Sequence, residues 1–281
     1  ERHLYGERTG NLRRKIEDST MKITLIGSGN LATNIGVALK NAGHQIVQVY
    51  SRRLLNAVSL ASRLEAKAVN QFSEINADVY ILSLKDSVLQ EVIAAVCKNK
   101  SDKIFLHTAG SVPMALFEGS AVRYGVLYPM QTFSKERIVD FRSLPCFIEA
   151  CDNSVLEKIK TLALSISTKV YTLSSADRKY LHLAAVFACN FVNHCYEISS
   201  ELLAAHSVPF DVLLPLIDET AHKVHELSPA HAQTGPAVRY DENVMEKHKM
   251  LLAASPLWQN IYELMSKSIH QTAIINNNKR I

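Results

Sequence analysis

Residues 21–43, MKITLIGSGNLATNIGVALKNAG, constrain the fold of this chain more than any other stretch. They open with a short apolar run, Ile23 to Ile26, that is typical of a β-strand. Gly27-Ser28-Gly29 then turns the chain into an amphipathic helix, and Gly43 is a natural residue for this helix to end on. The sequence therefore predicts a strand, a glycine turn and a helix in direct succession.

The turn follows the pattern G-x-G-x-x-A, in which each small residue has a mechanical role. Gly27 lets the chain bend sharply after the strand, Gly29 lacks a Cβ that would keep a pyrophosphate from the backbone, and Ala32 lets the helix pack on the strand. The helix N-terminus offers free N–H groups and the positive end of its dipole to phosphates. The residues that we expect to contact a dinucleotide are Gly27, Ser28, Gly29, Asn30, Leu31 and Ala32. An ordinary tight strand-to-helix turn is the alternative, but the place of the motif between a strand and a helix favours the dinucleotide site.

A second predicted strand, Gln45 to Tyr50, ends in Ser51-Arg52-Arg53 and indicates which dinucleotide binds. In folds of this kind an acidic residue near this point bonds the ribose 2′-hydroxyl of NAD, and no Asp or Glu is present here. A hydroxyl and two guanidinium groups suit the 2′-phosphate of NADP instead. We therefore expect NADP as cofactor, with Ser51, Arg52 and Arg53 as its contacts. The alternative is a serine helix cap followed by two surface arginines.

Three further apolar runs, residues 79–84, 103–108 and 124–130, predict strands of a mainly parallel sheet. The carboxyl ends of parallel strands meet at one edge of the sheet, where ligands bind in open α/β folds. The cofactor or active-site candidates at these ends are Ser83, Leu84, Lys85 and His107.

Two of these candidates have a structural alternative. Lys85 either touches the cofactor or substrate or is a solvated residue at a helix start, since Asp86 is a natural N-cap for a helix over residues 87–97. His107 either lines the cleft or is a structural, hydrogen-bonded histidine.

The strand signals stop abruptly in the middle of the chain. A last strand–helix–strand piece, residues 147–173, completes a predicted α/β domain over 21–173, a Rossmann-type doubly wound sheet. From Ser174 onward helical periodicity predicts an all-helical domain, residues 174–281. Residues 1–20 are polar, of mixed charge and without the apolar core of a signal peptide, so we expect a flexible leader.

The central helix of the second domain is predicted over residues 177–203, and it is apolar around most of its circumference, as a buried helix should be. At about 100° per residue its polar side chains share one stripe. The stripe consists of Lys179, His182, Cys189, Asn190, Asn193, Glu197 and Ser200. Such a stripe needs a polar partner, which is either the cleft holding nicotinamide and substrate, or another helix, a subunit or ordered water. His182 and Asn190 are candidates for proton transfer and substrate orientation, because imidazole titrates near neutral pH and amides both donate and accept hydrogen bonds.

A loop over residues 228–241 separates the remaining predicted helices, which span residues 209–227, 242–254 and 256–275. Gly235-Pro236 forces a turn in this loop and presents Arg239 beside Asp241. Arg239 would bind a carboxylate or a cofactor phosphate through paired hydrogen bonds, or it would bond Asp241 and fix the loop. The histidines nearby lack a carboxylate or thiolate that would complete a ligand set, so we expect no metal.

Composition excludes several classes of function. The net charge of +4 is small and no basic stripe with interleaved aromatics is present, so we expect no nucleic-acid partner. No apolar run approaches the roughly 20 residues that span a membrane. The chain has 5 cysteines and no C-x-x-C, which favours reduced, buried thiols and a cytoplasmic location.

Several motifs together resemble a known family. They are the Gly27–Ala32 turn, the His107-Thr-Ala-Gly loop, Tyr128-Pro-Met-Gln-Thr-Phe-Ser, His182 to Asn190, and Thr234-Gly-Pro-Ala-Val-Arg-Tyr-Asp. They look like the bacterial Rossmann-like NADP oxidoreductases, notably of Bacteroidetes, whose C-terminal half is classed as a domain of unknown function. The likeness covers residues 21–275, and more distantly the chain is similar to pyrroline-5-carboxylate reductase, deazaflavin-dependent NADP reductase and the 6-phosphogluconate dehydrogenase group. The resemblance implies an NADP-binding domain followed by a helical domain that often serves dimerisation.

The chain departs from these relatives at two points. Tyr240 stands where the Gly-Pro loop of the family ends in Arg-Gly-Asp. The hydroxyacid dehydrogenases carry a catalytic Lys four residues before an Asn, whereas Lys179 is followed at that spacing by Leu183. The mechanism of those enzymes is therefore not transferred to this chain.

These patterns predict an NADP-dependent oxidoreductase that transfers a hydride between nicotinamide and a small carbonyl, hydroxyl or imine compound. His182 or Lys85 would exchange the proton, while Asn190, Asn193 and Arg239 would orient the substrate. A non-catalytic NADP-binding sensor or scaffold is the alternative, and it would need no proton donor near the nicotinamide. We also expect a homodimer, because the apolar faces of the helical half need cover.

Overall fold

The computed structural model describes residues 20–278, so the predicted leader lies outside the described residues except for Thr20. The chain forms two compact units that divide between Cys189 and Asn190. The change from strands to helices falls earlier, between β8 (Val170–Thr172) and α6 (Ser175–Ala185). The domain boundary that we place after residue 173 stays a prediction.

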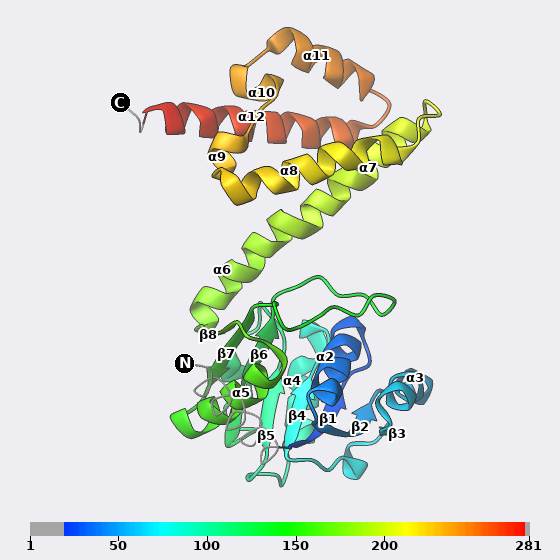
Figure 1. The fold of residues 1–281 in the computed structure, drawn as a ribbon, viewed down its shortest axis with the longest axis vertical. Helices are drawn as coiled ribbons and strands as arrows, with labels where there is room; N and C mark the ends of the chain where they lie inside the picture. The colour runs from blue at the N-terminus through cyan, green and yellow to red at the C-terminus, as the bar shows by residue number, and fades with distance from the viewer. Residues whose placement is uncertain (1–19, 279–281) are drawn as a thin grey trace, which may run out of the picture. The chain divides into compact units, whose positions relative to one another are not determined.

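The first unit is built on an 8-stranded sheet in the order β3-β2-β1-β4-β5-β6-β7-β8 (Figure 1). The strands before β8 are β1 (Lys22–Ile26), β2 (Gln45–Tyr50), β3 (Lys67–Val69), β4 (Val79–Leu82), β5 (Ile104–His107), β6 (Arg123–Pro129) and β7 (Cys146–Ala150). Neighbouring strands run parallel except β6 and β7, which are antiparallel. This sheet, with the helical region that follows it, confirms the predicted fold class.

Both faces of the sheet are covered, which explains why its strands are almost continuously apolar. The helices and helical turns of this unit are α2 (Asn30–Asn41), α3 (Leu54–Leu64), η1 (Phe72–Glu74), α4 (Asp86–Val96), η2 (Met114–Phe117) and α5 (Asn153–Ile166). Side chains of α2, α3 and α5 share one core with Leu25, Ile81 and Leu106. Those of α4 and η2 share the other core with Leu82 and Phe105.

The strand register brings the candidate loops to one edge of the sheet. Ile26 pairs with Leu82, Leu82 with His107, and His107 with Val126. Because these strands are parallel and in step, the segments after β1, β4, β5 and β6 leave the sheet side by side. The fold thus gathers the predicted glycine turn and the strand-end candidates along the same edge.

The second unit is helical. Its elements are α7 (Val192–Ala204), η4 (Phe210–Leu213), α8 (Leu214–Glu226), α9 (Pro229–Ala232), α10 (Pro236–Arg239), α11 (Glu242–Leu251) and α12 (Pro256–Asn278). The long helix α12 packs against α9, α10 and α11. Among the described residues of this unit only Ala237, Leu252 and Ser266 are buried. Across residues 20–278, no helix combines the length and the apolar character that crossing a membrane requires.

The predicted continuous α-helix over 177–203 is interrupted. A π-helical segment, η3 (Val186–Phe191), lies between α6 and α7. A π turn holds more residues than an α turn, so it rotates the following side chains relative to those before it. The single polar stripe, which assumes about 100° per residue throughout, is therefore wrong beyond Val186. The expectation of a buried helix is also wrong for the single chain, since residues 183–195 are almost all exposed.

The predicted loop over 228–241 is wrong as well, because it contains α9 and α10. Proline occupies the first turn of each short helix, where its missing N–H costs nothing. Tyr240 ends α10 in the left-handed conformation, with φ 53°, which is uncommon for an aromatic residue. Its ring lies 4.4 Å from that of His270, centroid to centroid, and this packing holds the strained residue in place. Tyr240 thus adopts a backbone conformation that favours glycine, the residue that the family resemblance leads us to expect there.

Candidate active site

The glycine turn has the geometry that a phosphate site requires. Gly27 has φ +116°, and a Cβ there would come within 2.2 Å of the Ser83 carbonyl oxygen, so β1 and β4 approach each other closely at this point. Gly29 faces open space, with no atom within 4 Å of the position of a Cβ. Helix α2 begins without a side-chain cap and without an acidic residue in its first turn. Its first N–H groups are therefore available to an anion.

Asn30 differs from the other turn residues in that its side chain is engaged. Its Nδ2 donates to the carbonyl oxygen of Phe133 at 2.9 Å, and the buried Asn34 holds the same segment through the Ser134 carbonyl and the Val139 N–H. The segment that follows β6 is therefore fixed along α2. This bond fixes the Asn30 side chain, so the backbone N–H is the group of Asn30 that we expect to face a phosphate.

The end of β2 presents two guanidinium groups to solvent. Arg52 and Arg53 are exposed, and Arg53 rather than Ser51 occupies the N-cap position of α3. The alternative of a serine helix cap is therefore wrong. Among the described residues, the arginines that form ion pairs are Arg142 and Arg178. Arg52 and Arg53 thus keep their hydrogen-bond donors for a bound group.

The ends of β4 and β5 are tied together by side chains. Thr108 Oγ1 lies 3.2 Å from Ser83 Oγ, and Ser111 donates a hydrogen bond to Asp86. Lys85, not Asp86, is the N-cap of α4, so our expectation of an Asp86 cap is wrong. Asp86 faces Ser111 across the edge instead of capping its own helix. Lys85 is exposed at the start of α4, which agrees with the alternative of a solvated residue at a helix start.

His107 does not reach the surface of the cleft. Its side chain is fully buried and stacks on Phe117, with ring centroids 5.7 Å apart. Burial, together with the positive charge of Arg178, lowers the pKa of His107 to about 4, so the imidazole is neutral at neutral pH. The structural alternative for His107 is favoured, because a fully buried ring cannot contact a cofactor.

His182 lies at the same edge, where the structure gives it a partner that the sequence did not reveal. Its Nδ1 is 3.1 Å from the hydroxyl oxygen of Tyr128, the penultimate residue of β6. The ring also lies against Gly110, where a Cβ would come within 2.5 Å of Nδ1. Burial raises the pKa of Tyr128, and the nearby Arg178 acts in the opposite direction. The pair is therefore a neutral phenol hydrogen-bonded to an imidazole, which is a proton-transfer arrangement.

We expect Gly110→Ala to damage this pair. The added Cβ collides with the His182 imidazole, which must shift from its position beside Tyr128. Misplacing a catalytic group by about 1 Å costs as much as 100-fold, so we expect turnover to fall roughly 10- to 100-fold. NADPH affinity should stay unchanged, because the phosphate turn follows β1 and Gly110 follows β5, two strands away. Equal losses of turnover and of NADPH affinity would contradict this expectation.

One turn before His182, the buried Arg178 forms an ion pair with the partly buried Glu149. Arg178 is 1% exposed, and its guanidinium donates to Glu149 of β7 at 2.6 Å and to the Val112 carbonyl at 2.7 Å. Burial raises the pKa of Glu149, but hydrogen bonds from Ser175 and Arg178 outweigh it, so the carboxylate stays ionised. The sequence held two signals of this pair: a carboxylate within a predicted strand, and an arginine four residues before His182.

Three predicted substrate residues lie in the second unit. Asn190 and Asn193 are exposed, at the end of η3 and in the first turn of α7. Arg239 ends α10 and is also exposed. The rival role for Arg239, a bond to Asp241, does not occur; Asp241 caps α11 by accepting from the Val244 N–H instead. The roles of Asn190, Asn193 and Arg239 toward a substrate stay predictions.

Comparison with known proteins identifies the family of this chain. A family model described as "NADP oxidoreductase coenzyme F420-dependent" matches residues 22–110, and one described as a domain of unknown function, DUF2520, matches residues 144–269. The crystal structure of a putative NADP oxidoreductase from Bacteroides fragilis is 52% identical, covers 90% of this chain and 99% of its own, and superimposes with a TM-score of 0.87. The chain belongs to this family of NADP oxidoreductases. It is thus an enzyme of the NAD(P)-dependent oxidoreductase class with NADP as cofactor, as we predicted from the sequence.

More distant structures share the fold of this oxidoreductase. An imine reductase from Myxococcus stipitatus in complex with NADP+ is 12% identical, covers 90% of this chain and 94% of its own, and has a TM-score of 0.66. A pyrroline-5-carboxylate reductase from Coxiella burnetii is 18% identical, covers 90% and 97% of the two chains, and has a TM-score of 0.55. No curated protein matches the chain.

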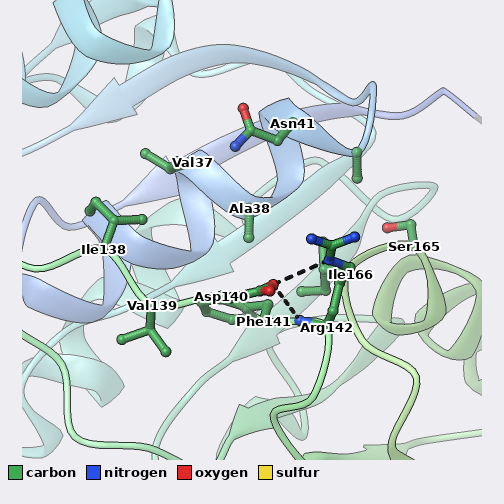
Figure 2. Close-up of a pocket in the computed structure, with 11 residues that line it drawn as sticks. Val37, Ala38, Asn41, Ile138, Val139, Asp140, Phe141, Arg142, Ser165 and Ile166 are labelled. Atoms are coloured by element: carbon green, nitrogen blue, oxygen red, sulfur yellow. Dashed lines mark hydrogen bonds and ion pairs between the residues drawn. The ribbon is translucent and has the colours of Figure 1, made fainter.

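The oxidoreductase also has a cavity apart from this edge. It has a volume of ≈ 490 Å³ and lies between the C-terminal half of α2, residues 138–142 and the end of α5 (Figure 2). Its wall is of mixed polarity and includes Asp140 and Arg142, which pair at 3.5 Å. None of the predicted site residues lines this cavity. It therefore does not belong to the candidate active site.

The remaining functional groups give no second centre in the described part of the oxidoreductase. Within residues 20–278, no group of three or more His, Cys, Asp or Glu is arranged to hold a metal ion. Cys97 and Cys146 are buried, and burial raises the pKa of each thiol to about 12. Cys151 is half-buried, and Cys189 and Cys195 are exposed, so the expectation of buried thiols is wrong for these three.

Proposed function

We propose that this protein is an NADP-dependent reductase or dehydrogenase that transfers a hydride between the nicotinamide C4 and a small carbonyl, hydroxyl or imine compound. The observation that carries the proposal is the Tyr128–His182 hydrogen bond on the same sheet edge as the glycine turn. The turn follows β1 and Tyr128 lies near the end of β6, three strand spacings apart, or roughly 14 Å. A dinucleotide is an extended ligand, and such a separation suits one that has its phosphates at one end and its reacting ring at the other.

Each part of the edge has a role in this proposal. The uncapped first turn of α2 binds the pyrophosphate, and Gly29 lets it approach the backbone. Ser51, Arg52 and Arg53 bind the 2′-phosphate. When bound, NADPH supplies the hydride from its nicotinamide ring. Ser83 and Leu84 lie at the end of β4, between these two regions, where they would contact the cofactor.

The chain itself would supply the proton. In one tautomer of His182 the Tyr128 hydroxyl donates to Nδ1, and Nε2–H remains to protonate a substrate. In the other, Nδ1–H donates to the Tyr128 oxygen, and the phenol proton is the one delivered. Lys85 remains a second candidate for the proton, and Asn190, Asn193 and Arg239 remain candidates for orienting the substrate.

The decisive experiment is a fluorescence titration of the protein with NADPH and NADH, followed by a panel of keto acids, aldehydes and cyclic imines. We expect tighter binding of NADPH than of NADH and NADPH oxidation with one class of the panel. Tight binding without turnover of any class would favour the sensor over the proposed reaction. Absence of binding would contradict the phosphate site.

We expect Arg52→Ala and Arg53→Ala to weaken NADPH binding by about tenfold each while leaving NADH binding unchanged. Charge-assisted hydrogen bonds are worth about 1.5–3 kcal/mol, and both side chains are exposed, which reduces that value. Arg63→Ala removes an exposed arginine from the body of α3 and is the matched control. If both cofactors weakened equally, the arginines would not bind the 2′-phosphate.

We also propose that the protein is a cytoplasmic homodimer. Large apolar side chains of the second unit are exposed in the single chain, including Leu216 at 62%, Leu257 at 69% and Leu264 at 67%. Soluble monomers rarely leave so many large apolar groups in water, and a second copy would cover them. Sedimentation at several concentrations tests this: a mass near 31.3 kDa throughout would exclude the dimer.

A further inference from the structure

Arg178 stands at the junction of three segments that build the proton-transfer pair. Its guanidinium bonds Glu149 on β7, the Val112 carbonyl in the segment after Gly110, and Ser175 Oγ at the start of α6. Ser175 in turn donates from its N–H and its hydroxyl to the Glu149 carboxylate. These contacts join β7, the segment after Gly110 and the start of α6 at the buried guanidinium of Arg178.

His182 depends on the placement of the same segments. It lies four residues after Arg178, on the same face of α6, so the helix turn that Arg178 anchors also carries the imidazole. The loop that Arg178 holds at Val112 also carries Gly110, on which the imidazole rests. The Met114 N–H donates to Ser175 Oγ at 2.8 Å and closes the connection between loop and helix.

Stability alone gives a weak reason for this ion pair. A buried ion pair is often no more stabilising than apolar side chains of the same volume, because both charges lose their hydration. Arg178 Nε is also buried without a hydrogen-bond partner among the described residues, which adds to the cost. The geometry suits a residue that fixes the positions of these segments. The positive charge of Arg178 also acts to lower the pKa of Tyr128.

We propose that Arg178, paired with Glu149, is a positioning residue that holds the His182 imidazole in hydrogen-bonding contact with Tyr128. The inference rests on the proposed role of the Tyr128–His182 pair in proton transfer. Arg178 itself does not touch the pair's reacting atoms. It acts through the first turns of α6 and through the segment from Gly110 to Met114.

The proposal is tested by determining the tautomer of His182 by NMR. This measurement needs neither cofactor nor substrate. The full chain, labelled with ¹⁵N-histidine, gives Nδ1 and Nε2 chemical shifts at pH 7.5, and the His182→Gln variant assigns the signal. We expect one fixed tautomer in the wild type, and shifts that move toward the tautomer average in Tyr128→Phe. The double variant Glu149→Leu/Arg178→Met, which replaces the ion pair by apolar groups, should give the same His182 shifts as Tyr128→Phe. His222 on α8 serves as the internal control and should not move.

Arg178→Lys keeps the positive charge but loses the forked geometry of the guanidinium. We therefore expect its His182 chemical shifts to lie between those of the wild type and those of the double variant. If the double variant does not fold, Arg178→Lys takes its place in the test. A shifted His182 signal in folded Arg178→Lys then supports the proposal. A folded variant of either kind with wild-type His182 shifts, while Tyr128→Phe moves them, would show that the ion pair is structural only. Absence of any effect of Tyr128→Phe would overturn the proposal too.

These outcomes are separate from those of the proposed function. If the His182 signal responds as expected but no compound of the panel is reduced, the positioning role stands and the reaction does not. If a compound is reduced, Arg178→Lys should lower kcat by at least about tenfold and leave NADPH affinity within twofold. A change confined to thermal stability, with kcat unchanged, would also contradict the positioning role.

Discussion

Replacing Gly29 with aspartate should abolish NADPH binding and leave the fold intact. Gly29 has φ −81°, its Cβ would meet no atom within 4 Å, and it occupies the N-cap position of α2. Aspartate is among the preferred N-cap residues, so its carboxylate should cap the helix and keep or raise the melting temperature. The same carboxylate takes the place of the pyrophosphate and repels it. Like charges in contact cost several kcal/mol, so we expect binding to weaken more than about 100-fold.

Two variants separate the charge from its location. Gly29→Ala adds only a Cβ and should weaken NADPH binding less than aspartate does. Ser154→Asp adds the same charge in the first turn of α5. This helix follows β7, which runs antiparallel to β6, so the charge lies away from the edge that carries the glycine turn and should not change NADPH affinity. NADPH titrations and thermal melts of all three variants decide the matter. Native affinity in Gly29→Asp would remove the basis for placing the phosphates at this turn.

Removing the Tyr128 hydroxyl should lower turnover about 100-fold or more, in line with the usual contribution of a general acid or base. Tyr128→Phe keeps the ring in its 9% exposed position and removes only the partner of His182. His182→Gln should have an effect of the same size, since the two groups act as one unit. The measurement is kcat with a compound of the panel that the wild type reduces.

The matched control is Tyr171→Phe, which removes a phenol hydroxyl from β8, where the side chain is 50% exposed. It should leave kcat unchanged, and neither Tyr128→Phe nor His182→Gln should alter NADPH affinity by more than twofold. Full turnover in both pair variants would move the proton-donor role to Lys85, the remaining candidate at this edge.

Much of the fold is predictable because its signals are local. The strand from Gln45 to Tyr50 has the bounds that its apolar pattern and flanking glycine and serine indicate. The glycine turn is equally local, since three small residues within six positions define it. Prediction failed where a residue type suits more than one local role. Asp86 is a good N-cap residue, but its side chain instead accepts a hydrogen bond from Ser111 of another loop.

The candidate site was predicted only in part, for the same reason. His182 was identified by its chemistry, whereas its partner Tyr128 was missed because 54 residues separate the two. His107 ends a strand as expected, yet Phe117 covers it and removes it from the cleft. The π-helical segment over Val186–Phe191 has no local signature that we recognised, and it changes which side chains share a face with His182.

The sequence by itself determined the fold class, the strand–turn–helix succession at Gly27–Ala32 and the NADP family, because periodicity, glycine spacing and charge are local properties of the chain. Only the tertiary structure decided which titratable groups meet. The contacts of Arg178 with Glu149 and with Val112 span 29 and 66 residues, and the signals along the chain do not specify that these groups pair with one another. They form because neighbouring strands and the first turns of α6 bring their side chains to one edge, where burial leaves each charge and hydroxyl in need of a partner.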